Sequence, residues 1–505
     1  MSFGPGFGAI SPDELHALRD TMARNRLRKA VEAGYNTPGV SSEMGGTLVP
    51  QSLEQTLASA TFQAQDCVAW RSFPKTDVQA TVSEFTRIEE HGNSDVDPWF
   101  AEGGKPASVQ SRYTRDFTKI KYLGVEGSVT FPMMHSRIIG SSPNAEAEEA
   151  TRKTLHLLGM MERAIYFGDS KMDTLAFDGL SKLIPAANIH DLRNQPLTGK
   201  VMREDMSFQR DLNAMPNLVL MSNASRMIIG NLGEHNIRRP VLPGQSGAGQ
   251  RVGMTAVGVE ADHGFVPFES TIFLKARGGA TLGSFGPTGL ELTFTGGTQP
   301  EVVALGAGEK SNFVSDDKGH YRYVYVGVGI SDDKMFVTPP LVAADADGEL
   351  VGNADKEKIR AVVVAPIGTK YIRVYRQFKA GTADTANPPV ELTQEYLDGA
   401  KFAFDVATRS GANAGTALTS VTAVTIDDLN KDIPGTTWSF SLQMTPDVVE
   451  IVRLLDLMKL DLALIDTTKK FLLILFASLR SRTPSKLWAW RNCSVLHGAP
   501  EFGDF

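Results

Sequence analysis

The sequence predicts an α+β protein in which one long helix organises a body of strands, with a β-sandwich inserted late in the chain. Three observations support this fold class. Residues 143–168 have helical spacing and end in a helix stop. Residues 286–436 form many short β-like segments separated by Gly, Asp, Asn and Pro. Residues 471–479 then form a continuous apolar strand that suits the interior of the first body.

Length and composition restrict the class of protein. At about 150 residues per domain, 505 residues make about three domains, or one large domain with an insertion. Hydrophobic residues at 42% and charged residues at 22% are typical of a globular chain. The net charge of -7 argues against a protein that holds nucleic acid through broad phosphate contacts. Cys67 and Cys493 are too few for a disulfide framework, and we expect neither a secretory signal nor a membrane span.

The long helix is expected over residues 143–168. Ser142 can cap it, Pro143 suits its first position and Gly168 stops it. Its apolar positions recur at helical spacing, which predicts one buried stripe and charged residues on the other faces. The stripe is expected to comprise Ala147, Ala150, Leu155, Leu158, Met161, Ala164 and Ile165, and the other faces to carry Arg152, Lys153 and Glu162.

A polar arm, residues 94–134, precedes this helix. Aromatic and β-branched residues are scattered there among charged ones, which predicts a two-stranded ribbon too polar to be buried in its own domain. Because an isolated ribbon is only marginally stable in water, we expect it to rest on a neighbouring subunit. The charged residues expected at that contact are Glu102, Lys105, Arg112, Arg115, Lys119 and Lys121.

The order of these segments resembles the major capsid protein of tailed bacteriophages with the Hong Kong 97-type fold. In that family a glycine-bearing extended loop precedes a long spine helix. Here residues 102–106, Glu-Gly-Gly-Lys-Pro, resemble the start of the loop, and residues 144–167 resemble the spine. The resemblance implies a subunit that self-assembles into hexamers and pentamers of an icosahedral shell. That shell would enclose double-stranded DNA without sequence-specific binding.

The resemblance also implies a domain organisation. Residues 1–46 would form an N-terminal arm with a helix, and residues 47–285 the body with its extended loop, spine helix and first part of an axial sheet domain. Residues 286–436 would form an inserted immunoglobulin- or fibronectin-like β-sandwich, and residues 437–505 would return to the body. Peripheral and axial sheet domains would both be present. Scaffold, portal and decoration proteins would be further partners of a virion protein assembled in the host bacterial cytoplasm.

Local patterns predict the remaining elements. In the body we expect strand-like alternation at 70–87, a buried strand at 217–222 followed by a helix at 224–232, and strands at 254–259, 265–268 and 271–274. In the insertion we expect strands at 321–329, 361–365 and 371–376. After the insertion, Thr445 is expected to cap a helix, and the chain closes with Trp488, Trp490 and Asn492.

Motifs for chemistry are near misses. Residues 244–248 lack the last glycine of a nucleophile elbow, and Glu309 stands where a phosphate loop needs glycine. Leu350 interrupts a calcium-loop pattern that begins at Asp345 and Asp347. His91 and His156 are expected to be surface and helix residues rather than ligands. We therefore expect no catalytic residue, cofactor or metal.

Two alternative functions remain open on the sequence. One is a hydrolase with an accessory β-sandwich, which would require an acid, base or nucleophile constellation that the motifs do not supply. The other is a carbohydrate-binding protein whose exposed aromatics would form the binding surface. The insertion offers Tyr321, Tyr323 and Tyr325 for such a surface, although half of any alternating set should be core. If the insertion is instead a projection, a short linker should be able to replace it.

Overall fold

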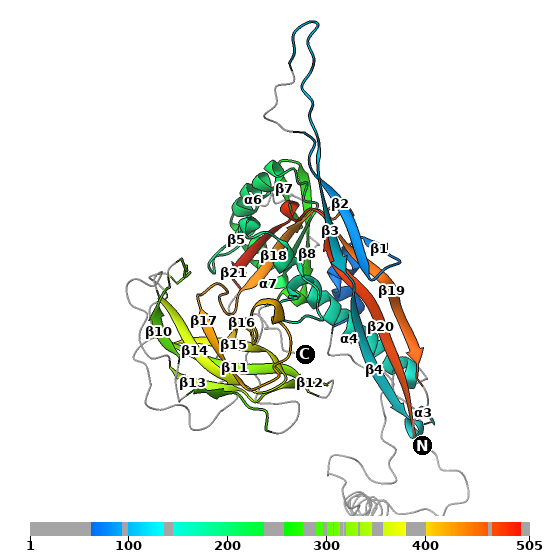
Figure 1. Ribbon diagram of the computed structural model, residues 1–505, viewed down its shortest axis with the longest axis vertical. Coiled ribbons are helices and arrows are strands. Elements are labelled where there is room, and N and C mark those ends of the chain that lie inside the picture. The colour runs from blue at the N-terminus through cyan, green and yellow to red at the C-terminus, as the bar shows by residue number, and fades with distance from the viewer. Residues whose placement is uncertain are drawn as a thin grey trace, which may run out of the picture. The chain divides into compact units, whose positions relative to one another are not determined.

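The protein has a mixed α+β fold, seen in a computed structural model (Figure 1). The structure describes residues 62–92, 99–135, 145–236, 257–275, 289–295, 300–306, 308–313, 317, 320–331, 334–345, 357–379, 400–462 and 467–495. The chain divides into a small unit, Met1–Ala60 with Thr130–Glu148, and a large unit, Thr61–Val129 with Glu149–Phe505. The predicted N-terminal arm, the nucleophile-elbow near miss at 244–248 and the helix-start residues Ser142 and Pro143 lie outside the described residues.

Helix α4, Ala145–Phe167, confirms the predicted long helix. It ends where the Gly168 amide donates to the Ala164 carbonyl at 2.8 Å. A Cβ at Gly168 would lie 2.3 Å from the Phe177 carbonyl oxygen, so glycine is required there by close approach of the backbone. The shorter helices are α2 (Val68–Ser72), α3 (Phe131–His135), α5 (Leu180–Leu183), α6 (Gly199–Asp211) and α7 (Asn223–Asn236), with 3-10 turns η1 (Ala64–Asp66), η2 (Ala186–Asn188), η3 (Ile272–Leu274), η7 (Gly411–Asn413) and η8 (Pro484–Lys486).

A four-stranded sheet lies against α4, which runs along it in Figure 1. Its order is β1-β19-β20-β4, with β1 parallel to β19 and β19 antiparallel to β20. On the face toward the helix, Leu475 and Ala477 of β20 share a core with Met161 and Ile165 of α4. The strands are β1 (Lys75–Asp77), β4 (Lys121–Thr130), β19 (Val449–Asp461) and β20 (Thr468–Ser481).

The predicted stripe of α4 is partly wrong. Met161 and Ile165 are buried as expected, but Leu157 is also buried and Glu162 is fully buried. Ala147 is exposed, and Leu155 and Leu158 are only half-buried. The reason is that α4 packs on more than one element, because its core also includes residues of α2 and of a second sheet.

Glu162 is buried because it serves the start of α2. Its carboxylate accepts the Ala69 amide at 2.7 Å and the Trp70 amide at 2.8 Å, and Tyr166 donates its hydroxyl at 2.8 Å. Burial raises the pKa of Glu162 even though these hydrogen bonds act in the opposite direction. A carboxylate is tolerated here since the first amides of a helix have no intrahelical partner.

A six-stranded sheet forms the second part of the body, in the order β5-β21-β18-β6-β8-β7. Its central strand β6 is buried along its whole length and leads directly into α7, as the sequence predicted. Met202 and Met206 of α6 pack on the sheet beside Met221 and Trp490. The strands are β5 (Ile189–Asp191), β6 (Leu218–Ser222), β7 (Gly258–Ala261), β8 (Gly264–Thr271), β18 (Thr437–Leu442) and β21 (Trp488–Cys493).

Three local predictions in the body are wrong. Trp70 lies in helix α2 rather than in a strand. Residues 272–274 form η3 rather than a strand, because the Thr271 hydroxyl accepts the Phe273 amide and caps a tight turn. Thr445 begins a turn and no helix: the Val448 and Val449 amides both donate to its carbonyl, and the β-branched Val449 then starts β19 opposite Ser481.

Strands β9 to β17 form two sheets that share one core, here called the two-sheet body. One sheet has the order β10-β14-β17 with β9 also on β14, and the other has β12-β11-β15-β16 with β13 also on β11. The predicted strands at 321–329, 361–365 and 371–376 are confirmed within β11, β14 and β15. The strands are β9 (Thr293–Phe294), β10 (Glu301–Ala304), β11 (His320–Ser331), β12 (Lys334–Val337), β13 (Leu341–Asp345), β14 (Glu357–Ala365), β15 (Thr369–Lys379), β16 (Lys401–Ala407) and β17 (Thr422–Asp428).

The tyrosines of β11 are core residues, so the idea of an exposed aromatic surface is wrong for them. Tyr321, Tyr323 and Tyr325 are 4%, 1% and 1% exposed. Residues two apart in a strand share a face, and this face meets Ile359 and Val363 of the opposite sheet. The sequence could not show that the face with tyrosines is the buried one, because tyrosine is compatible with either environment.

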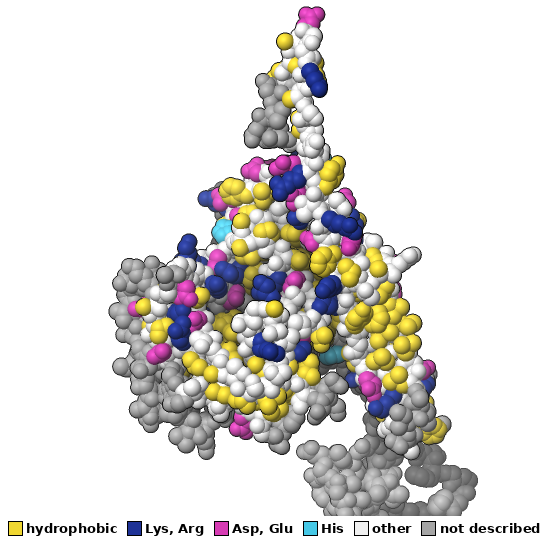
Figure 2. All heavy atoms as spheres, viewed as in Figure 1, with side chains coloured by type: hydrophobic (Ala, Val, Ile, Leu, Met, Phe, Trp, Pro, Cys, Tyr) yellow, Lys and Arg dark blue, Asp and Glu magenta, His cyan; other side chains and the backbone are white. Residues whose placement is uncertain are grey.

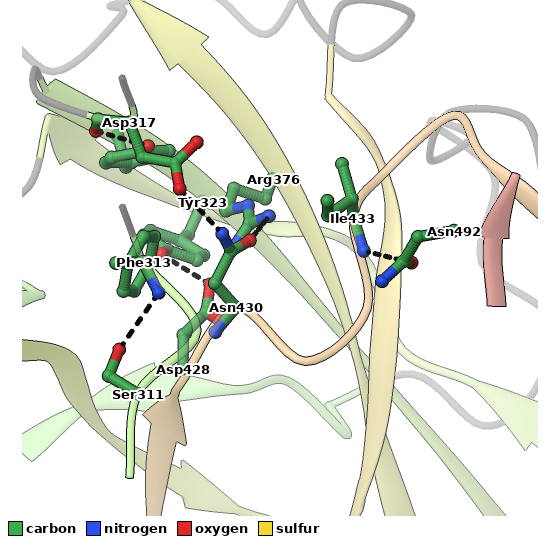
Figure 3. A network of polar contacts seen from close by, with 10 residues as sticks. Ser311, Phe313, Asp317, Tyr323, Arg376, Asp428, Asn430, Ile433 and Asn492 are labelled. Atoms are coloured by element: carbon green, nitrogen blue, oxygen red, sulfur yellow. Dashed lines mark hydrogen bonds and ion pairs between the residues drawn. The ribbon is translucent and has the colours of Figure 1, made fainter. Parts of the chain in front are cut away.

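A buried polar network lies where the chain leaves the two-sheet body (Figure 3). Arg376 donates to Asp428 at 2.6 Å and to the Asn430 side-chain oxygen at 2.7 Å, and Tyr323 donates to the same Asp428 carboxylate at 2.8 Å. Further along, the Ile433 amide donates to the side-chain oxygen of Asn492 at 3.0 Å. The connector from β17 to β18 is thus tied at one end to the two-sheet body and at the other to the six-stranded sheet.

Candidate assembly surface

A two-stranded hairpin presents a group of exposed apolar side chains. It consists of β2 (Val82–Glu90) and β3 (Arg112–Lys119), paired antiparallel, with residues 99–111 between them free of helix and strand where described. The sequence placed a ribbon within residues 94–134, which is only partly right. Strand β3 pairs with β2, which begins earlier, and β4 instead joins β20 of the four-stranded sheet. The alternation of apolar and polar residues indicates a strand but does not indicate which other strand it pairs with.

One face of the hairpin is exposed and rich in apolar side chains, and we call it the hairpin face. Ile88 lies opposite Tyr113, and Glu84 lies opposite Phe117, so these side chains share that face. Ile88, Tyr113 and Phe117 are 53%, 63% and 57% exposed. Exposed apolar side chains that gather on one face commonly mark an interaction site. The full face comprises Val82, Glu84, Thr86, Ile88, Tyr113, Arg115, Phe117 and Lys119.

The opposite face of the hairpin is anchored at its root. Ser83 and Phe85 are buried there: Arg480 of β20 donates to the Ser83 hydroxyl and lies 5.5 Å from the centre of the Phe85 ring. Arg480 also donates to the buried Glu450 of β19, which accepts from Arg482 as well, at 2.9 Å. Burial alone would raise the pKa of Glu450, but Thr76 and the arginines outweigh it and hold that pKa below its ordinary value.

The six predicted contact residues differ in what they do within the chain. Glu102 and Lys105 are exposed beyond the strands, close in sequence to the exposed Trp99 and Phe100. Arg112 and Arg115 are already paired inside the hairpin, with Glu89 at 3.0 Å and with Glu84.

The two lysines are divided between solvent and the body. Lys119 is exposed with its ammonium 6.0 Å from the Phe117 ring centre. Lys121 donates to the Thr174 carbonyl. Their predicted role between subunits stays a prediction, and Lys121 is the one whose ammonium is directed to its own body.

A second apolar surface was missed by sequence reasoning. The face of the four-stranded sheet away from α4 carries Ile474 and Phe476 of β20, because Leu475 and Ala477 point to the helix. Tyr122 of β4 is 60% exposed and packs edge-on against Phe476, with ring centres 4.7 Å apart. Figure 2 shows hydrophobic side chains gathered over β19 and β20. We call this surface the outer sheet face: Tyr122, Leu455, Met458, Leu460, Leu472, Ile474 and Phe476.

The pattern of residues 455–476 could have indicated this face. Apolar side chains occur there on both faces of β20, which suits a strand covered from two sides. Only one of those sides is covered by α4 in the described part of the chain. Met458 and Leu460 accordingly remain 38% and 39% exposed.

The remaining chemical candidates have structural roles where they are described. Glu309 accepts from Lys358 at 2.6 Å and from the Gly306 amide at 2.9 Å, so it closes a turn. Cys67 and Cys493 are buried free thiols, and burial raises the pKa of each to about 12. His91 and His156 are exposed. Within the described ranges no group of three His, Cys, Asp or Glu residues could hold a metal ion, and no described helix has the length and apolar character to span a membrane.

Comparison with known proteins gives relatives along nearly the whole chain. The major capsid protein of Staphylococcus phage K is 21% identical over 480 residues, covering 91% of this chain and 93% of the relative. The major capsid protein of Staphylococcus phage S25-3 matches with the same identity and coverage. No family model matches the chain.

Among solved structures, one from Microbacterium phage Oxtober96 covers 88% of this chain and 96% of its own, at 10% identity and a TM-score of 0.40. A TM-score this low does not establish a shared fold. The alignments with the sequence relatives, by contrast, cover more than 90% of this chain and of each relative, and each relative is named a major capsid protein. On these matches the chain is a phage major capsid protein.

Proposed function

We propose that this chain has the Hong Kong 97-type fold and assembles into hexamers and pentamers of an icosahedral shell, with the β2–β3 hairpin of one subunit lying on its neighbour. The observation that carries this proposal is the hairpin face. Ile88, Tyr113 and Phe117 are each more than half exposed, on a ribbon whose described anchor is at its root, where Arg480 donates to Ser83. Burying the exposed half of each would stabilise a contact by about 1–1.5 kcal/mol, roughly half of the value for full burial of an apolar side chain.

The outer sheet face is the complementary surface in this proposal. Both surfaces belong to every subunit, so each copy would present a hairpin to one neighbour and a sheet face to another. Such a heterologous contact closes into rings when the rotation between copies allows it. Many such contacts, each weak alone, give a stable shell through multivalency. The hairpin's own ion pair between Arg115 and Glu84 would keep its charged side chains from being buried without partners.

The rest of the proposal follows the same assembly. Residues 286–436 would be an inserted immunoglobulin-like domain, of which β9 to β17 are the described strands. The shell would form in the host cytoplasm, enclose DNA without reading its sequence and meet scaffold, portal and decoration proteins. It would act by assembly and without catalysis. For a carbohydrate-binding alternative the tyrosines of β11 offer no support, since they are buried.

The test is the double variant Tyr113→Ser with Phe117→Ser. Both side chains are exposed, so the subunit should fold normally, and shells should be lost because the contact loses most of its apolar area. The control is Met335→Ser on β12, which removes a side chain that is 66% exposed elsewhere. Circular dichroism reports folding, and electron microscopy with sedimentation reports particles. Normal shells from the double variant would refute the role of the hairpin face.

A further inference from the structure

The segment between α4 and α5, residues 169–178, is contacted by two distant parts of the chain. From the two-sheet body, Lys370 of β15 reaches the Asp173 carboxylate at 2.8 Å, and the turn after η7 brings Gly415 against the segment. From the hairpin root, Lys121 donates to the Thr174 carbonyl. We call residues 169–178 the junction segment.

The contact with Gly415 is a close fit of backbone on backbone. Gly415 has a φ of +76°, and a Cβ there would lie 2.9 Å from the Lys171 carbonyl oxygen and 3.0 Å from the Thr174 nitrogen. Neither atom belongs to a flexible side chain that could move aside. Any larger residue must therefore push the turn and the junction segment apart.

The Lys370 contact is partly shielded from water. The Lys370 side chain is 9% exposed, whereas that of Asp173 is 35% exposed. An ion pair with one nearly buried partner is less screened by solvent and salt than a surface pair. The contact thus holds the junction segment at a second point, independent of the fit at Gly415.

Thr174 links the two sets of contacts. Its amide and its hydroxyl are both directed to the Gly415 carbonyl at 3.5 Å, while its own carbonyl accepts from Lys121. Lys121 begins β4, one residue after Ile120, whose amide donates to the Thr81 carbonyl beside the start of β2. A displacement of Thr174 would therefore reach the point where both strands of the hairpin leave the body.

We propose that the two-sheet body is an internal brace: through Gly415 and Lys370 it fixes the junction segment, and through Thr174 and Lys121 it fixes the root of the β2–β3 hairpin. The brace acts within one subunit and does not depend on the proposed contact between subunits. It gives the inserted strands a role in positioning, in addition to any role on the surface of a shell.

Gly415→Ala is the test, with Gly411→Ala as its matched control. Both glycines have positive φ, +76° and +68°, so alanine adds the same kind of backbone strain. A Cβ at Gly411 would meet nothing within 4 Å, so only Gly415→Ala disturbs the junction segment. Hydrogen exchange on the unassembled full chain should be roughly tenfold faster for amides of 170–176 and 121–123 in Gly415→Ala, and unchanged there in Gly411→Ala.

A second variant, Lys370→Met, keeps the aliphatic stem and removes the charge. It should raise exchange at the same two places by a smaller factor, and it decides the question if Gly415→Ala fails to fold. Faster exchange at 170–176 with no change at 121–123 would show that the brace ends at the junction segment, and the proposal would fall. Equal effects of the two glycine variants would also overturn it, because strain alone would then explain them.

Discussion

At the scale of single residues, the buried carboxylate of Glu450 links strands of the four-stranded sheet and orients Arg480, which in turn donates to Ser83 at the hairpin root. It is fully buried, accepts from Arg480 and Arg482 and also takes the Thr76 hydroxyl. A buried charge of this kind is costly to desolvate and contributes only while its partners are in place. The residue is therefore more important for keeping a defined geometry than for the net stability of the pair.

We expect Glu450→Gln to lower the free energy of unfolding by about 3–5 kcal/mol near neutral pH, because it leaves Arg480 buried without a countercharge. Since the pKa of Glu450 is lowered in the fold, its contribution is present above the ordinary value of 4.5 and is lost as the pH falls through the lowered pKa. The difference in the free energy of unfolding between the wild-type protein and Glu450→Gln should thus become smaller in acid. Urea unfolding followed by fluorescence at several pH values measures it.

Asp456→Asn is the control for this prediction. Asp456 pairs with Arg453 at 2.9 Å, but its side chain is 66% exposed, so its loss should cost less than about 1 kcal/mol. A gap for Glu450→Gln that stays constant down to strongly acid pH would contradict the assignment of the effect to the ionised carboxylate.

At the scale of elements, substitutions in α4 test which of its side chains form the buried stripe. Leu157 is 1% exposed, so Leu157→Ala should destabilise the protein by about 2–5 kcal/mol through lost burial and a cavity. Met160→Ala on the same helix should change stability by less than about 0.5 kcal/mol, because Met160 is 43% exposed. Thermal unfolding of both variants gives the comparison. Similar losses for the two would mean that the helix is rotated relative to its core.

The hairpin is the second element for which the structure predicts the effect of a change, here a deletion. Deletion of residues 107–127 takes away β3 and most of β4, and β4 belongs to the four-stranded sheet. Such a deletion should unfold the body. A better deletion replaces residues 93–110 with a short turn and keeps both strands of the hairpin.

We expect this shorter deletion to leave a folded subunit that makes fewer or no closed shells, because it removes Trp99 and Phe100, 87% and 59% exposed. Size-exclusion chromatography gives the yield of folded subunit and electron microscopy the yield of shells. Wild-type shells from this variant would restrict the contact to β2 and β3 themselves.

At the scale of the whole molecule, the two-sheet body has a core of its own. The hydrophobic cluster around Tyr323 and Val363 contains residues of β9 to β17 and their loops. The two clusters around α4 and the four- and six-stranded sheets contain none of these residues. The two parts should therefore fold separately. Their contacts through Lys370, Gly415 and Asn492 are polar or backbone contacts, which position the parts more than they stabilise them.

Replacing residues 289–428 with a Gly/Ser linker should consequently leave a folded body, since loop-closure entropy grows slowly with length. Its junction segment should exchange at least as fast as in Gly415→Ala, because the Lys370–Asp173 ion pair is lost together with the contact of Gly415. Circular dichroism and hydrogen exchange check both expectations. An unfolded product would show that strands β9 to β17 are needed for the rest of the chain to fold.

The sequence by itself determined the features that depend on local periodicity. The sequence predicted the helix over Ala145–Phe167, the buried strand Leu218–Ser222 with its following helix, and three strands of the two-sheet body, β11, β14 and β15. These were predictable because the spacing of apolar residues and the helix-stop and turn residues act within a few positions. Residues 102–106 followed by the helix at 144–167 also indicated a resemblance to phage major capsid proteins, the class to which the sequence relatives belong.

Only the tertiary structure decided how the elements pair and which faces are covered. In the tertiary structure β4 lies beside β20, and Glu162 and the tyrosines of β11 are buried. Thr445 begins a turn there and not the predicted helix. Each outcome depends on contact with a segment distant in sequence, and the local pattern of residues does not indicate which segment that is. For the same reason the outer sheet face and the fit at Gly415 were invisible in the sequence: both exist only once separate segments meet.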